Sequence, residues 1–191
     1  MLRGRLLGGD DYEEFSPIDK IFNAIIIILT VLMLSAIFVK EVWLKPYLIS
    51  GTSMEMTLQS DDWVLADALK APERGDVVII YNRHKGVMLV KRVIALPGDV
   101  IYYDQYGSVY DKTSDGYTKR EEKYAVIKNG NNPVLSEYTV GEGEVFVMGD
   151  NRGVSEDSRR WGGMLISDIK GVVSQWVIDN RKTLRWIYPY V

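Results

Sequence analysis

The apolar residues of the chain fall into one unbroken run followed by a series of short segments. Residues 21–39 are almost wholly apolar, with only Asn23 and Ser35 as polar interruptions. A helix rises about 1.5 Å per residue, so roughly 20 apolar residues cross the hydrocarbon core of a bilayer. The run shows no polar face, which the amphipathic helix of a soluble core would need. It therefore predicts a membrane-spanning helix.

Helix signals flank this run on both sides. Ser16 suits an N-cap, Pro17 the first helical position, and Asp19 the first turn. Pro46 disfavours helix at the residue before it, so we expect the helix to extend from about residue 17 to about residue 43. A cleaved signal peptide is less consistent with the pattern, because its apolar run is shorter and small residues mark its cleavage site.

The remaining apolar residues form short segments of β type, separated by turn residues. Regularly spaced short strands favour a mostly-β, barrel-like domain. Residues 104–123 are polar and rich in Tyr, without an apolar period, and are expected to form an exposed insertion or a hairpin. The expected strands are 63–65, 76–81, 87–96, 100–103, 124–127, 144–148 and 170–178.

Composition removes several classes of function. The formal net charge of −3 gives the whole chain no electrostatic footprint for nucleic acid. The absence of Cys excludes a thiol nucleophile, a disulfide framework and a Cys-ligated zinc site. The single histidine, His84, stands in a polar stretch that indicates a turn. A Ser-His-Asp triad would have to use this residue, so a serine hydrolase here is expected to use another base.

Ser53 and Lys91 are the candidate nucleophile and base. A serine hydroxyl needs an adjacent base, and a lysine serves as one only when it is neutral. Strand alternation places Lys91 on one face with Leu89 and Val93, and apolar surroundings lower a lysine pKa. Taken alone, the strand favours a lysine whose ammonium extends to the solvent-exposed rim. Arg92, on the other face, needs a carboxylate partner if it is buried.

Two polar loops complete the candidate site. Gly51 gives the backbone freedom, and its N–H group together with that of Ser53 could form an oxyanion hole. An ordinary loop glycine is the alternative. The polar run 151–160 directly follows the apolar residues 145–148. It could bring a hydroxyl and a carboxylate to Ser53, or it could be a solvated loop.

Together these segments resemble the type I signal peptidase family, membrane-bound Ser-Lys enzymes that remove signal peptides from exported proteins. The resemblance covers most of the chain and implies a mostly-β fold, with antiparallel sheets in a barrel-like catalytic domain preceded by one N-terminal transmembrane helix. The segments that carry it are the apolar run, Ser50–Leu58, Arg74–Val78, Lys91–Asp99 and Gly149–Gly162.

The resemblance implies a role for each matched residue. Ser53 is the nucleophile and Lys91 the general base. Ser155 is the hydroxyl that orients the lysine ammonium. Met54 lines the site, and Asp150 is a structural acid in the glycine-bounded turn.

The resemblance also implies an ion-pair cluster, in which Asp157 is the partner of both Arg92 and Arg159. The chain departs from the family at Met56, where a proline is usual. Proline fixes φ and removes a donor, so its loss leaves the turn less constrained. This departure bears on efficiency and substrate range more than on the nucleophile.

The family also implies partners and a location. The expected substrates are signal-peptide-bearing preproteins with small residues one and three positions before the cut, and no cofactor or metal is expected. The expected layout is a cytoplasmic tail at 1–16, a signal-anchor helix at 17–43 embedded in the lipid bilayer, and an extracytoplasmic catalytic domain at 44–191. Lysine as the base, a single anchor and a compact domain are similar to the Gram-positive bacterial type, in the cell membrane.

Two other functions are open from the sequence. A self-cleaving Ser-Lys repressor would have DNA-binding helices at its N-terminus in place of the apolar run. A non-catalytic signal-peptidase-like accessory factor for assembling surface structures such as pili would be expected to lack Ser53 or Lys91, and both are present.

Overall fold

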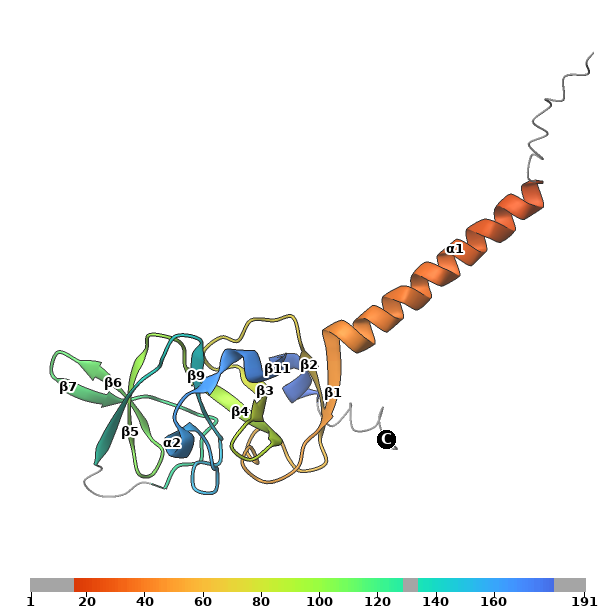
Figure 1. The fold of residues 1–191 in the computed structure, drawn as a ribbon. Coiled ribbons are helices and arrows are strands. Elements are labelled where there is room, and N and C mark those ends of the chain that lie inside the picture. The colour runs from red at the N-terminus through yellow and green to blue at the C-terminus, as the bar shows by residue number, and fades with distance from the viewer. Residues whose placement is uncertain (1–15, 129–133, 181–191) are drawn as a thin grey trace, which may run out of the picture. The chain divides into compact units, whose positions relative to one another are not determined.

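The computed structural model describes residues 16–128 and 134–180. The chain divides into two compact units, residues 1–39 and residues 40–191. The first contains helix α1 (Pro17–Phe38), and the second contains all of the described strands (Figure 1). Of the predicted tail at 1–16, only Ser16 is described.

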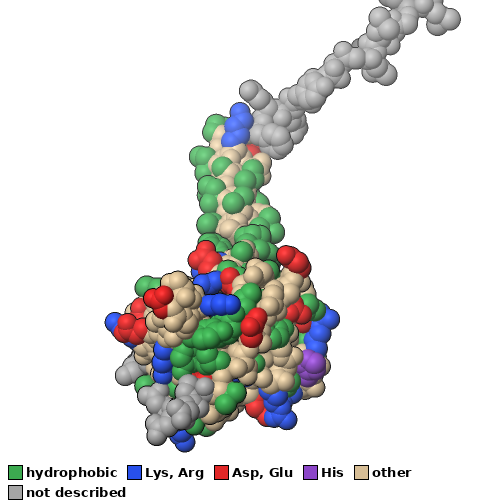
Figure 2. All heavy atoms as spheres, turned by 90° about the vertical axis from the view of Figure 1, so that its left-hand side faces the viewer, with side chains coloured by type: hydrophobic (Ala, Val, Ile, Leu, Met, Phe, Trp, Pro, Cys, Tyr) green, Lys and Arg blue, Asp and Glu red, His purple; other side chains and the backbone are tan. Residues whose placement is uncertain are grey.

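Helix α1 begins where its capping residues predict. The Ser16 hydroxyl accepts a hydrogen bond from the Asp19 N–H at 3.2 Å, and the Asp19 carboxylate accepts one from the Ser16 N–H at 3.1 Å. A π-helical segment, Val39–Trp43, continues the helix. The span Pro17–Trp43 has 27 residues, and an 18-residue stretch within it has a mean hydropathy of 2.7, so the span is long and apolar enough to cross a membrane. Apolar side chains stand out along the length of its visible surface (Figure 2). The predicted bounds of the helix are confirmed.

The strands form two sheets in which every neighbouring pair is antiparallel, which confirms the mostly-β fold class. Within the described residues, β1 and β10 are the edges of the larger sheet, so it does not close into a barrel. The seven-stranded sheet has the order β1 (Leu44–Leu48), β2 (Trp63–Asp67), β11 (Ile169–Val173), β3 (Val77–Asn82), β4 (Val87–Ala95), β9 (Glu144–Met148) and β10 (Met164–Leu165). The four-stranded sheet has the order β7 (Gly116–Lys119), β6 (Val109–Thr113), β5 (Val100–Asp104) and β8 (Leu135–Thr139).

Two of the predicted strands differ from the structure. Residues 124–127 do not form a strand, because only Val126 bridges to another segment, at Asn151. The segment 170–178 divides, since β11 ends at Val173 and the short helix α3 (Gln175–Asp179) begins after the N-cap Ser174. The hairpin expected within 104–123 is present as β6 and β7. Strands β1, β8 and β10 were not predicted. The short helices α2 (Ser158–Trp161) and η2 (Ile166–Asp168) complete the fold.

Strands β3 and β4 lie inside the larger sheet, and most of β3 and residues 90–95 of β4 are buried on both faces. One apolar cluster contains Ile79 and Val90, and another contains Val78, Ile80 and Val93. A strand covered on both faces gives a polar side chain no direct route to water. Any charged residue in the middle of β4 must therefore find its partners inside the protein.

Candidate active site

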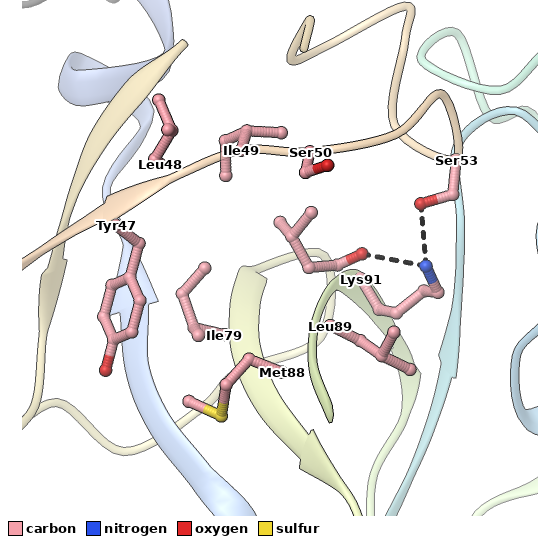
Figure 3. A pocket seen from close by; sticks show the side chains of 10 residues that line it. Tyr47, Leu48, Ile49, Ser50, Ser53, Ile79, Met88, Leu89 and Lys91 are labelled. Atoms are coloured by element: carbon pink, nitrogen blue, oxygen red, sulfur yellow. Dashed lines mark hydrogen bonds between the residues drawn. The ribbon is translucent and has the colours of Figure 1, made fainter. Parts of the chain in front are cut away.

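Lys91 lies in the buried part of β4, paired with Val78 of β3. The whole residue is only 2% exposed, so the alternative of a lysine reaching the solvent-exposed rim is wrong. Its Nζ donates hydrogen bonds to the Ser53 hydroxyl at 2.8 Å and to the carbonyl of Val90 at 3.1 Å (Figure 3). The structure therefore joins two residues that the sequence separates by 38 positions.

Burial controls the charge of this amine. It lowers the pKa of Lys91 from its usual 10.5 to about 8, while the nearby carboxylates of Asp157 and Asp150 oppose part of that lowering. A lysine with such a pKa has a substantial neutral fraction in mildly alkaline solution. In that form its nitrogen can accept the proton of the hydroxyl it contacts.

A tight turn holds Ser53 beside the amine. The N–H groups of Thr57 and Leu58 both donate to the Met54 carbonyl, at 2.8 and 2.7 Å. The Met54 side chain is buried, and its sulfur accepts a hydrogen bond from the Asp150 N–H at 3.3 Å. Met54 thus lies in the core behind the serine and is not among the residues that line the pocket described below.

The backbone before Ser53 has the features of an anion site. Gly51 has φ +91, in the left-handed region that favours glycine. A Cβ there would meet nothing within 4 Å, so backbone conformation and not crowding favours glycine. Within the described residues, the N–H groups of Gly51 and Ser53 donate to no protein acceptor. Both groups are therefore available to a substrate oxygen.

The loop after β9 approaches Ser53 from the other side. The Asn151 N–H donates to the Ser53 carbonyl at 2.9 Å. A Cβ on Gly149 would lie 2.6 Å from the same carbonyl and would also collide with the Ser155 side chain. Ser155 Oγ is buried and forms no hydrogen bond with any described residue. The contact with the Lys91 amine implied by the resemblance is therefore not formed.

The ion pairs differ in part from the prediction. Arg92 pairs with Asp150 and not with Asp157: Nε lies 2.8 Å from Oδ1, and Nη2 lies 2.6 Å from Oδ2. The reason is the sheet register, which sets Arg92 opposite Met148, two residues before Asp150. The predicted pair of Asp157 with Arg159 is present, at 2.8 and 2.9 Å. Asp157 also accepts the Gly149 N–H at 3.0 Å.

A mostly apolar cavity of about 120 Å³ opens beside Ser53 and Lys91 (Figure 3). Its size and chemistry suit a small apolar side chain. Much of its wall comes from β1 and the residues after it, which sequence reasoning missed because Pro46 was interpreted only as a helix stop. The signal was available in the alternation of Tyr47 and Ile49. The lining residues are Tyr47, Leu48, Ile49, Ser50, Ser53, Ile79, Met88, Leu89, Val90 and Lys91.

Within residues 16–128 and 134–180, no group of three or more His, Asp or Glu side chains is placed to hold a metal ion.

Comparison with known proteins gives consistent matches over most of the chain. The sequence model of the family described as "Signal peptidase, peptidase S26" matches residues 21–178. Signal peptidase I U of Bacillus subtilis (strain 168) is 38% identical over 152 residues, covering 75% of this chain and 81% of that protein. Signal peptidase I of Bacillus licheniformis is 37% identical over 163 residues, covering 78% and 86%. A crystal structure of a signal peptidase I from Enterococcus faecalis V583 covers 55% of this chain and 98% of that chain, with 31% identity and a TM-score of 0.43.

Proposed function

Because this chain belongs to the signal peptidase family, peptidase S26, we propose that it removes N-terminal signal peptides from exported preproteins with a Ser-Lys dyad. The observation that carries the proposal is the 2.8 Å contact between Ser53 Oγ and a buried Lys91 Nζ, beside a small apolar cavity. A non-catalytic accessory factor would have no need for this contact.

The reaction follows from the positions of these groups. Neutral Lys91 takes the proton of Ser53 as Oγ attacks the carbonyl carbon of the residue before the cut. The N–H groups of Gly51 and Ser53 donate to the oxygen that becomes negative. The protonated amine then gives its proton to the leaving nitrogen of the mature protein. The acyl ester on Ser53 is hydrolysed by water, with Lys91 again acting as the base.

The membrane topology is part of the same proposal. Helix residues Pro17–Trp43 would cross the bacterial cell membrane once, with residues 1–16 in the cytoplasm and the catalytic domain, 44–191, outside. Supporting it are the length and hydropathy of the span and the absence of any buried residue in α1. Protease added outside intact protoplasts should digest the catalytic domain, and full protection of that domain would contradict this orientation.

We expect the cavity to restrict the residue before the cut. A preprotein with Ala there should be cleaved, and replacing that Ala with Phe should slow cleavage by at least about 100-fold, because the ring overfills a small pocket. The measurement is kcat/KM for the two preproteins in detergent. Ser53→Ala is the control that assigns cleavage to this chain. Equal rates for Ala and Phe would overturn the assigned substrate class.

The pH dependence follows from the lowered pKa of Lys91. Only the neutral amine acts as base, so log(kcat/KM) should rise with pH below about 8 and level off above it. Lys91→Arg should be inactive at every pH, because arginine does not deprotonate in proteins. The measurement is the cleavage rate of a peptide substrate as a function of pH. An activity limb at the ordinary lysine pKa of 10.5 would contradict a buried base.

A further inference from the structure

A buried ion pair lies outside the proposed catalytic machinery. Glu122 and Arg152 have side chains that are 1% and 0% exposed. Nη1 of the arginine lies 2.7 Å from Oε2, and Nη2 lies 2.8 Å from Oε1. Such a pair is costly to bury, and each charge depends on the other, since removing one leaves the other uncompensated. Glu122 lies between Lys91–Asp99 and Gly149–Gly162, two of the segments that carry the family resemblance, and belongs to neither.

Arg152 fastens the loop that follows β9. Its Nε donates to the Gly149 carbonyl at 3.1 Å, and its Nη1 also donates to the Gly107 carbonyl in the turn between β5 and β6. A Cβ on Gly107 would lie 2.9 Å from the Cβ of Arg152. The arginine therefore packs closely between the four-stranded sheet and residues 149–152.

The segment that carries Glu122 lies along the same loop. The Val126 N–H donates to the Asp150 carbonyl at 2.8 Å, and the Arg152 N–H donates to the Val126 carbonyl at 3.2 Å. Tyr124 donates its hydroxyl to Glu122 at 2.8 Å, and the Arg92 guanidinium lies 4.0 Å from the centre of the Tyr124 ring. Residues 122–126 thus support both the loop and the Arg92–Asp150 pair.

The loop in turn contacts the nucleophile. The Asn151 N–H holds the Ser53 carbonyl, and the Asp150 N–H holds the Met54 sulfur. A displacement of residues 149–152 would therefore move the serine hydroxyl relative to the Lys91 amine. It would also admit water to an amine whose neutral form depends on burial.

We propose that Glu122 is a positioning residue for Ser53: it holds the buried Arg152, and through Arg152 the loop 149–152 that fixes the carbonyl of the nucleophile. The inference rests on the proposed Ser-Lys function and adds a residue to it. Glu122 touches neither substrate nor the reacting atoms, so its effect must pass through the loop.

The test is Glu122→Gln, which keeps the size of the side chain and removes its charge. We expect kcat to fall by roughly 100-fold, since a misplacement of about 1 Å costs that much. The KM for a peptide substrate should change far less, because no residue of the loop lines the pocket. The apparent pKa at which kcat rises with pH should increase toward the ordinary lysine pKa.

The matched control is Glu121→Gln, the same chemical change one residue earlier. Glu121 has a side chain that is 79% exposed and pairs with an exposed Lys123, so kcat, KM and pH limb should stay unchanged. If Glu122→Gln lowers only the unfolding temperature and keeps kcat and the pH limb, the residue is merely structural and the inference is wrong.

Should Glu122→Gln fail to fold, Tyr124→Phe gives a milder probe, because it removes only the hydroxyl that donates to Glu122. Tyr124→Phe should lower kcat and raise the apparent pKa of its pH dependence, each by less than Glu122→Gln does. An unchanged kcat and pH dependence would overturn the inference.

Failure of this inference can be distinguished from failure of the proposed function. Cleavage by the unaltered chain and by Glu121→Gln upholds the proposed function whatever Glu122 does. Absence of cleavage by the unaltered chain contradicts the function, and this inference with it.

Discussion

Ser53→Ala, Lys91→Met and the double variant should all retain nearly the same residual activity, roughly 10⁴-fold to 10⁶-fold below the unaltered chain. The two side chains share one proton-transfer step across their 2.8 Å contact, so removing either one abolishes that step. Single-turnover cleavage of a preprotein by the three variants measures the effect.

Ser50→Ala is the matched control for this experiment. Ser50 also lines the cavity, but its hydroxyl is not bonded to the amine. Its activity should stay within about tenfold of the unaltered chain, as expected when no transition-state contact is lost. If the losses from Ser53→Ala and Lys91→Met multiply in the double variant, the residues act independently and the dyad is not the catalytic unit.

Asp150→Asn should lower the free energy of unfolding by about 3–5 kcal/mol, because it leaves the Arg92 guanidinium buried without its counter-charge. The side chains of Arg92 and Asp150 are 7% and 0% exposed, so water cannot replace the lost carboxylate. Adding Arg92→Met to Asp150→Asn should recover part of this stability, since no unpaired charge is then buried. The measurement is urea unfolding, in detergent micelles, of the unaltered chain, Asp150→Asn and the double variant.

The control for this pair is Asp111→Asn, which breaks the ion pair with Arg120 in the smaller sheet. The Asp111 side chain is 54% exposed, so the expected loss is only about 0–1 kcal/mol. Equal decreases in the free energy of unfolding for Asp150→Asn and Asp111→Asn would show that burial does not increase the contribution of the Arg92–Asp150 pair to stability. The prediction concerns stability first, with activity falling because the loop at Asp150 also holds Ser53 in place.

The loop after β9 has two roles: its carboxylates neutralise buried arginines, and its backbone holds Ser53 in place. Asp150 and Asp157 neutralise the two arginines beside the site, and both also act on the pKa of Lys91. Glycine at 149 lets the loop come close enough for Asn151 to hold the Ser53 carbonyl. The polar run after β9 is therefore more than a solvated loop, because Arg152, Asp157 and Ser158 within it are buried.

Features set by neighbouring residues could be predicted from the sequence. The apolar helix has correct bounds because its cap, its proline and its apolar run all act within a few residues of one another. The strand of Lys91 and its apolar neighbours follow from alternation, which is also local. The segment 170–178 shows the limit of this approach, since an apolar run alone cannot place the turn at which β11 gives way to α3.

Features that join distant segments were decided only by the tertiary structure. The sequence required a carboxylate for Arg92, but the register of β4 on β9 selected Asp150, 58 positions away, over Asp157. The sequence identified Ser53 and Lys91 as candidate nucleophile and base. The contact between their side chains depends on how the turn after β1 packs against β4. Periodicity states which face of a strand a side chain occupies, and says nothing of which segment covers that face. That choice comes from the packing of the whole domain, where the pocket and the Glu122–Arg152 pair are formed.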